Sequence, residues 1–398
     1  MTQIFFDPQQ HYDCLQCGRG CRAGWDIPVE PEVVARVQTL PVRSDAFRQT
    51  YACPRHPQEV PGEAGKCPRC HLDAVHQVFI RNSKDSPNCS FLDPDQLCSI
   101  HRELGYEAKP ATCKLFPFVL TQTPDGVYAG TTYYCTATRQ NHGRPSSAHI
   151  DDLRHQLAHQ APVNKVAADG LVVYGRYYIS YRDYQGLEAE LTRRAARRGY
   201  LETLSLATLG LGCLMAELPD LEEEIVAIGE RLPEMWNHPA FPYGSPVARL
   251  QELSRSQLAD YFMFSLEKSL WPEVESGLNQ GTAFSLPHFN WRGTFGDLEK
   301  LVDDRFNSKI ERYLEHLVWR KALVVHPLLL PSLCQLQMLP TFLKVQAGLL
   351  AHLRNHEVTE QDYYDALENA ETYLVTHGRN RRIIHEWAAD ILLGTLRG

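Results

Sequence analysis

The stretch Cys14-Leu-Gln-Cys17-Gly-Arg-Gly-Cys21 places three thiols within eight residues near the start of a chain of 398 residues. Gly18 and Gly20 let the backbone turn closely around an ion or a cluster. Thiols on one tight turn converge on a common point, which is the arrangement that metal sites use. Four further thiols follow: Cys89, Cys98, Cys113 and Cys135. We expect these seven cysteines to be metal ligands.

The distribution of cysteine along the chain favours metal over disulfides. Ten of the 12 cysteines lie in the first 135 residues. A disulfide framework needs an oxidising compartment, whereas the first residues, MTQIFFDPQQHYDC, lack the basic and apolar segments of a secretory signal. We therefore expect metal ligation in the cytoplasm. Cys213 and Cys334 lie among leucines and are expected to be buried small hydrophobic side chains.

Seven thiols exceed the four ligands of one tetrahedral site. Four thiolates hold a [4Fe–4S] cluster, and the other three would then bind a second ion, coordinate a substrate or be structural. Two zinc sites with shared or mixed ligands are the competing arrangement. The spacing of the seven cysteines is compatible with a [4Fe–4S] cluster and with two zinc sites.

A second ligand set lies in residues 51–75, YACPRHPQEVPGEAGKCPRCHLDAV. Two residues separate Cys53 from His56, and two separate Cys67 from Cys70. Three sulfurs and one nitrogen suit tetrahedral zinc, and His71 is an alternative to His56. A closed site of this kind would fold a segment that has no apolar periodicity of its own. A role in sensing or transferring metal is the alternative.

This segment resembles the small heavy-metal-binding domain found at the start of some copper-transporting ATPases. The resemblance rests on the C-P-x-H-P and P-G-x-C-P-x-C style of the motif, and its second half reads Ala64-Gly65-Lys66-Cys67-Pro68-Arg69-Cys70. The family continues with Gly-Met, whereas this chain has His71-Leu72. Without that methionine, zinc is favoured over copper.

The order of the seven-cysteine set resembles the YkgJ-type CxxCxxCC cysteine-cluster family, whose members are described as zinc- or iron-chelating. The family pattern joins a C-x2-C-x2-C-C run to C-x-F-L, C-x-I and R-P-x2-C-R-x-F-P-F blocks. The resemblance covers roughly residues 12–140, and Gly20 lies where the third cysteine of the family run would be. The later blocks read Cys89-Ser-Phe91-Leu92, Cys98-Ser-Ile100-His101 and Lys109-Pro110-Ala-Thr-Cys113-Lys114-Leu-Phe116-Pro117-Phe118.

The family includes a flagellin lysine N-methylase group of about this length. Cys21-Arg-Ala-Gly-Trp25-Asp-Ile-Pro looks like the Cys-x-x-G-W segment of that group, and residues 310–321 are similar as well. The resemblance implies a metalloprotein that methylates the lysine of a protein substrate with S-adenosylmethionine. The alternatives are a non-enzymatic protein for metal storage, sensing or delivery, and a zinc-stapled scaffold that binds a protein partner.

Composition and charge narrow the possible partners. Residues 1–145 contain 15 basic and 15 acidic residues, and the rest contains 25 and 33, which accounts for the net charge of −8. We therefore expect no nucleic-acid partner. The 22 residues 322–343 are long enough to cross a bilayer. Because they include Pro327, Pro331 and Pro340, we expect buried core helices there and no membrane partner.

The predicted fold class is α+β. A small metal-stabilised cysteine-rich module over residues 1–145 contains the zinc-knuckle-like insert at 51–75, and a larger all-α domain follows over 146–398. A short helix is expected at 31–40, a hairpin at 116–121 and 127–134, a linker at 141–147 and a strand at 171–181. An irregular loop is expected at 277–296. Helical spacing predicts helices over 184–198, 201–218, 221–232, 247–271, 298–325, 328–356, 359–376 and 379–396.

Overall fold

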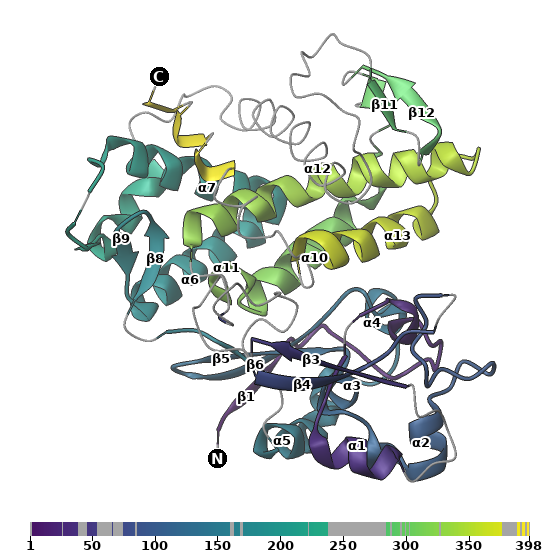
Figure 1. Ribbon diagram of the computed structural model, residues 1–398. Coiled ribbons are helices and arrows are strands. Elements are labelled where there is room, and N and C mark those ends of the chain that lie inside the picture. The colour runs from purple at the N-terminus through teal and green to yellow at the C-terminus, as the bar shows by residue number, and fades with distance from the viewer. Residues whose placement is uncertain are drawn as a thin grey trace. The chain divides into compact units, whose positions relative to one another are not determined.

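The computed structural model describes residues 2–25, 27–38, 46–53, 66, 75–83, 86–159, 163–167, 170–221, 223–237, 284–286, 289–294, 297–298, 300–301, 303–325, 328–375, 388–390, 392–394 and 396–397. It combines small sheets and helices (Figure 1). The chain divides into two units. The cysteine-rich unit consists of Phe6–Leu120 and Thr131–Val163, and the helical unit consists of Met1–Phe5, Thr121–Gly130 and Asn164–Gly398.

A three-stranded antiparallel sheet supports the cysteine-rich unit. Its strands are β2 (Ile27–Val29), β4 (Val75–Ile80) and β3 (Phe47–Ala52), in that order. Helix α1 (Pro31–Val37) follows β2 and confirms the predicted helix; its proline suits a first turn, where no N–H donor is needed. Together these elements bury an apolar cluster of Val29, Val33, Val37, Ala46, Ile80, Phe91, Ile100 and Ala108.

The insert connects the paired strands β3 and β4 of the cysteine-rich unit. Strands β3 and β4 stay in register up to Ala52, which lies opposite Val75. The chain therefore leaves the sheet after Ala52 and re-enters it at Val75, and these two residues lie opposite each other. Of this segment the structure describes Cys53 and Lys66.

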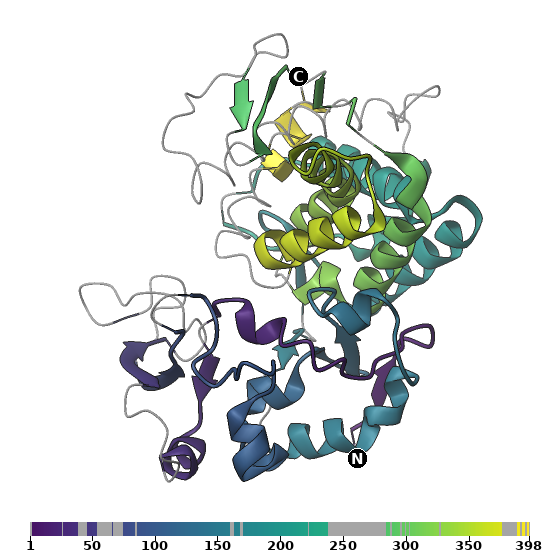
Figure 2. The ribbon, with the colours of Figure 1, turned by 90° about the vertical axis from the view of Figure 1, so that its right-hand side faces the viewer.

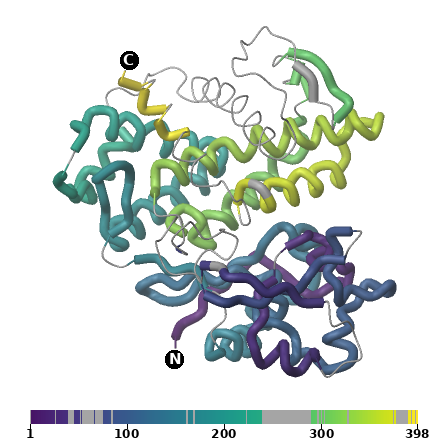
Figure 3. The backbone as a smooth tube through the Cα atoms, viewed as in Figure 1, coloured from purple at the N-terminus to yellow at the C-terminus, as the bar shows by residue number. Residues whose placement is uncertain are grey.

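Short helical elements complete the cysteine-rich unit, and Figure 3 traces them along the backbone. Helices this short do not persist alone in water, so their positions depend on packing and on the loops between them. The N–H of Ala111, for example, donates to Glu30 Oε1 at 3.2 Å. The elements are η1 (Gly20–Arg22), α2 (Ser99–Leu104), η2 (Tyr106–Ala108), α3 (Ala111–Leu115), α4 (Thr136–Arg139), η3 (Ser146–His149) and α5 (Ile150–Ala158).

The stretch predicted as a linker, residues 141–147, is instead paired with the start of the unit. Tyr12 N–H donates to the Arg144 carbonyl at 2.8 Å, and Asp13 N–H donates to the His142 carbonyl at 2.9 Å. The Arg144 guanidinium also bonds the Asp13 carboxylate. The linker prediction is therefore wrong, because these long-range bonds hold the segment. The chain passes finally to the helical unit after α5, between Val163 and Asn164.

A four-stranded sheet contains the predicted hairpin. Its order is β1 (Ile4–Phe6), β6 (Gly126–Thr131), β5 (Phe118–Thr123) and β7 (Asn164–Lys165). Strands β5 and β6 are neighbours joined by a two-residue turn, so the hairpin prediction is confirmed. Thr123 Oγ1 donates to the Gly126 carbonyl at 2.9 Å and closes this turn.

Helices build most of the helical unit. Helix α12 packs against α7 and α13, and Figure 2 shows α13 alongside it. Twenty of the 25 residues of α12 are buried, which agrees with its largely apolar sequence. No helix in the described part of the chain is long and apolar enough to cross a membrane. The helices are α6 (Tyr181–Arg198), α7 (Tyr200–Glu217), α10 (Asn307–Trp319), α11 (Ala322–Val325), α12 (Leu329–Leu353) and α13 (Glu360–Ala370), with a π-helical turn at Glu371–Val375.

The second half is mostly helical, as predicted, but it is not all-α, because it also contains short strands. The predicted strand at 171–181 is a hairpin of β8 (Leu171–Tyr174) and β9 (Tyr177–Ile179), because Gly175 turns with a φ of +56°. The predicted helix at 221–232 is replaced by β10 (Val226–Ala227), which pairs with β9, and by a 3-10 helix. Two short antiparallel strands, β11 (Phe284–Leu286) and β12 (Trp291–Gly293), lie in the expected irregular loop.

The predicted helix at 298–325 is divided. A 3-10 turn (Asp304–Phe306) precedes α10, and the chain leaves helical geometry at Lys321, whose φ is +69°. Thr121 Oγ1 donates to the Arg320 carbonyl at 3.2 Å, a partner that the sequence pattern does not reveal. The predicted helix at 247–271 and most of that at 379–396 lie outside the described residues.

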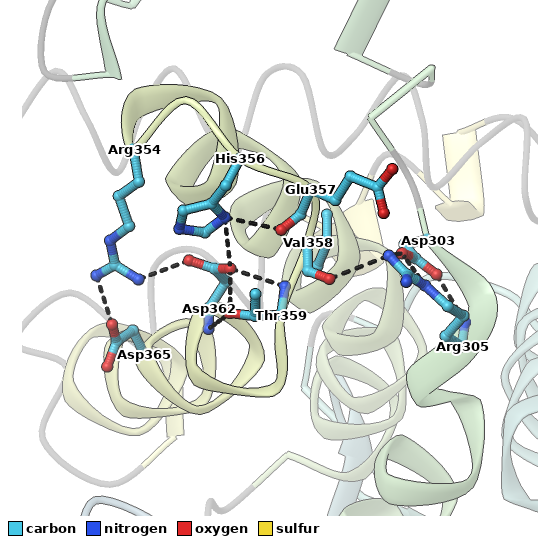
Figure 4. A network of polar contacts seen from close by, with 9 residues as sticks. All are labelled: Asp303, Arg305, Arg354, His356, Glu357, Val358, Thr359, Asp362 and Asp365. Carbon is cyan, nitrogen blue, oxygen red and sulfur yellow. Dashed lines mark hydrogen bonds and ion pairs between the residues drawn. The ribbon is translucent and has the colours of Figure 1, made fainter.

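A buried carboxylate fixes the start of α13 (Figure 4). Asp362 accepts from Thr359 N–H at 2.8 Å and from Thr359 Oγ1 at 2.6 Å, which completes a capping box. Its other oxygen bonds Arg354 at 2.6 Å. Burial acts to raise the pKa of Asp362, but the bonds from Thr359 and the charge of Arg354 hold that pKa below its usual range.

Replacing this carboxylate is expected to destabilise the helical unit. Asp362→Asn should lower the free energy of unfolding by about 1–3 kcal/mol, because it removes a charge-assisted cap in a buried position. Since the folded pKa is lowered, the contribution is present above the unfolded pKa of about 3.9 and is lost as pH falls through the folded value. Denaturant unfolding at neutral pH measures it. Asp365→Asn removes the more exposed partner of the same arginine and serves as control, with an expected loss below about 1 kcal/mol. An equal loss in both variants would contradict the assignment.

Candidate metal centre

All seven cysteines of the first set line one cavity in the cysteine-rich unit. The cavity has a volume of about 620 Å³, which lies in the range of small-molecule sites, about 300–1,000 Å³. The structure thus brings together thiols that are spread over most of this unit's sequence: Cys14, Cys17, Cys21, Cys89, Cys98, Cys113 and Cys135.

Loops and the first turns of short helices position these thiols. Cys14 and Cys17 lie on the loop before η1 and are exposed, whereas Cys21 lies within η1. Cys89 lies between β4 and α2, and Cys113 lies in α3. The two remaining thiols, Cys98 and Cys135, are the N-cap residues of α2 and α4.

Backbone amides point at the sulfur of three cysteines. Gln16 N–H donates to Cys14 Sγ at 3.3 Å, and Phe91 N–H donates to Cys89 Sγ at 3.4 Å. The amides of Ala137 and Thr138 act in the same way on Cys135 and lower the pKa of its thiol against the effect of burial. A hydrogen bond to sulfur stabilises the thiolate over the thiol. In each case a backbone donor lies two residues after the cysteine.

Burial opposes the ionisation of these thiols. It raises the pKa of Cys21, Cys113 and Cys135 above the usual value. Neighbouring thiols add to this effect: Cys89, Cys21 and Cys98 raise the pKa of Cys113 further. Several thiolates can therefore form together only if a cation compensates their charge.

Lys109 is a cavity residue that was not among the predicted site residues. It lines the cavity, and its charge lowers the pKa of Cys21 and of Cys113 against the effect of burial. Its Nζ lies 5.6 Å from the centre of the Tyr106 ring. Its place in the Lys109-Pro110-Ala-Thr-Cys113 block, where the family pattern has arginine, is the signal that could have identified it.

Aromatic side chains form one wall of the cavity. Trp25 and Phe116 line it, with ring centres 5.9 Å apart. Tyr134, which is buried, packs behind Trp25 at 4.6 Å. Such an apolar wall lowers the local polarity on its side of the cavity, which strengthens electrostatic interactions there.

The thiols suit a thiophilic metal in type, number and amide support. They lie on the walls of the cavity. Within the described part of the chain, no group of three or more His, Cys, Asp or Glu side chains is already arranged to hold an ion.

The second predicted set lies mostly outside the described residues. Cys53 is 1% exposed, whereas His56, Cys67 and Cys70 are not described. The predicted zinc ligation by this set stays a prediction. Cys213 in α7 and Cys334 in α12 are buried as expected, and burial raises the pKa of Cys334 to about 12.

Comparison with known proteins gives one match. No curated protein and no solved structure was found to match the chain. Residues 13–137 match the family model CxxCxxCC, whose description reads "Putative zinc- or iron-chelating domain". All seven thiols of the cavity fall within the matched segment. The cysteine-rich unit is therefore similar to a domain described as chelating zinc or iron.

Proposed function

We propose that the cysteine-rich unit binds zinc or iron through the cysteines of its cavity. The observation that carries the proposal is seven thiols on one cavity wall, three of them with amide donors aimed at sulfur. A bound cation stabilises the thiolates that burial disfavours, so binding releases protons. Four thiolates would hold either a [4Fe–4S] cluster or a zinc ion, and coordination would draw the walls of the cavity together.

Bound metal would also stabilise the unit. An ion that binds only the folded state raises the free energy of unfolding by about 2.7 kcal/mol when free metal is about 100 times its Kd. Exposed thiols such as Cys14 and Cys17 stay reduced in a reducing compartment. The proposal therefore includes a cytoplasmic location.

Removing single thiols tests this function. Cys14→Ser and Cys113→Ser are each expected to lose metal, because serine is a poor ligand for thiophilic ions. Cys213→Ser and Cys334→Ser change buried thiols of the helical unit and should keep the full metal content. Elemental analysis of anaerobically purified protein measures the content. Brown absorption that dithionite bleaches would identify an iron–sulfur cluster, whereas a colourless protein with zinc would identify zinc. Unchanged metal in both cavity variants would refute the proposal.

The insert is proposed to hold a separate zinc ion through Cys53, His56, Cys67 and Cys70. Support comes from the paired ends of the segment at Ala52 and Val75, which let it fold without altering the sheet. The double variant Cys67→Ser/Cys70→Ser is expected to lose one zinc and to keep the metal of the cavity. Metal analysis, with circular dichroism as a check on folding, measures this. Loss of the cavity metal as well would show that the two sets are not independent.

A second candidate function is methyl transfer to a protein lysine, which the sequence resemblance implies. The cavity volume of about 620 Å³ favours it, because a metal ion alone needs much less space. Metal-loaded protein incubated with labelled S-adenosylmethionine and a cell lysate is expected to label protein lysines. The Cys113→Ser variant is the control. If protein with its full metal content produced no label, the methyl-transfer function would be refuted and metal binding would stand.

A further inference from the structure

A positive charge without a carboxylate partner lies on the wall of the cysteine cavity. Lys109 lines the cavity and is half-buried, and its Nζ lies 5.6 Å from the centre of the Tyr106 ring. Within the described part of the chain, no carboxylate forms an ion pair with this ammonium. A partly desolvated cation of this kind favours the binding of an anion from outside the chain.

Other charged side chains of the cavity already have partners. Arg102 and Lys114, two further cations there, bond glutamate carboxylates at 3.1 and 3.4 Å. Asp13, one of the two acids of the cavity, bonds Arg144 at 2.9 Å, and the second acid is Asp152. Four cations and two acids line the cavity in all. A ligand of complementary charge is therefore an anion.

An aromatic wall lies close to the Lys109 ammonium. The charge of Lys109 acts on the Cys21 thiol, so the two side chains are neighbours in the cavity. The residue before this cysteine, Gly20, faces Phe116, because a Cβ at Gly20 would lie 3.2 Å from Cε1 of that ring. Phe116 and Trp25 form the wall, with ring centres 5.9 Å apart. One ligand can therefore contact both the ammonium and the rings.

Much of the remaining lining is apolar and reaches the protein surface. Leu15 and Leu97 line the cavity and are each 37% exposed. Phe91 and Ile100 line it from the apolar core of the unit. Small-molecule sites typically combine such apolar walls with a few polar groups that fix the orientation of the ligand. The cavity has this composition as well as a volume in the range of such sites.

We propose that the cavity binds an aromatic organic acid, with the acid group on Lys109 and the ring against Trp25 and Phe116. This site goes beyond the proposed metal binding, which uses the thiols of the same cavity. Burial of the ring removes apolar surface from water, and the ion pair fixes its orientation. A neutral aromatic ligand would bind through the first interaction alone.

Two fluorescent dyes with the same ring system separate these two interactions. Anilinonaphthalene sulfonate has an acid group, whereas phenylnaphthylamine is the same molecule without it. The protein as purified is expected to bind the sulfonate about tenfold more tightly than the neutral dye, because a partly buried charged pair contributes about this factor. Fluorescence titration measures both Kd values. Equal affinity for the two dyes would overturn the proposal.

Two lysines of the cavity provide a matched pair of variants. Lys109→Gln is expected to remove the advantage of the sulfonate and to leave the Kd of the neutral dye unchanged, and Lys109→Arg should keep the advantage. Lys114→Gln changes a cavity lysine that is already paired with Glu107, and should change either Kd by less than about twofold. If Lys109→Gln weakened both dyes equally, Lys109 would act through the thiols or the fold, and the assignment would be overturned.

The aromatic wall is tested in the same way. Trp25→Leu is expected to weaken both dyes by about threefold to tenfold, because it removes an aromatic contact that does not depend on charge. Trp25→Phe should restore most of this affinity. Denaturant unfolding of each variant verifies the fold, because the sulfonate dye also binds partly folded protein. Unchanged affinity in Trp25→Leu would overturn the placement of the ring.

Elemental analysis of the same samples keeps this inference separate from the proposed metal binding. Protein that contains its full metal and binds neither dye would overturn the ligand site alone. Protein that contains no metal and still binds the sulfonate through Lys109 would support the ligand site and refute the metal binding.

Discussion

Seven thiols that share one cavity cannot all be ionised unless a cation lies among them. Burial raises the pKa of Cys21, Cys113 and Cys135, and each thiolate formed makes the next one more costly. Lys109, together with Arg19, Arg102 and Lys114, which also line the cavity, supplies fewer positive charges than seven thiolates would need. Backbone amides that donate to sulfur reduce the free energy needed to form thiolates, but they do not remove it. The arrangement of the whole unit is therefore suited to a multivalent ion.

The apolar core of the cysteine-rich unit is joined to segments that carry its thiols. The sheet β2-β4-β3 and helix α1 bury apolar side chains together with Phe91 and Ile100, and Cys89 and Cys98 pack against this cluster. The seven cavity thiols themselves lie on loops and on short helices. Helices this short orient the cysteines they carry but contribute little stability by themselves. An apolar core can thus keep the loops in place while the thiols remain free to close on an ion.

The sequence predicted that the seven cysteines belong to one site, and the structure places them around one cavity; their metal ligation stays a prediction. Turns with two-residue spacing and glycine identify thiols that face one point, and all seven cysteines indeed line one cavity. Lys109 was missed because a lysine before a proline resembles any surface lysine. Contacts between segments far apart in the sequence were not predicted, because local sequence patterns do not reveal them. Strand β10 exists because it pairs with β9, and the pairing of residues 141–147 depends on a segment more than 120 residues earlier.

The surroundings of Gly20 bear on one departure from the cysteine-cluster pattern. Gly20 lies where that pattern has a further cysteine, and a Cβ at this position would lie 3.2 Å from Cε1 of Phe116. A side chain there would require the ring, which lines the cavity and packs against Trp25, to move by a few tenths of an ångström. The pattern has phenylalanine at the position of Phe116 as well as the further cysteine, so the ring by itself does not account for the glycine. With glycine at this position the cavity has seven thiols, and seven cannot fill two four-coordinate sites without sharing or a ligand from elsewhere.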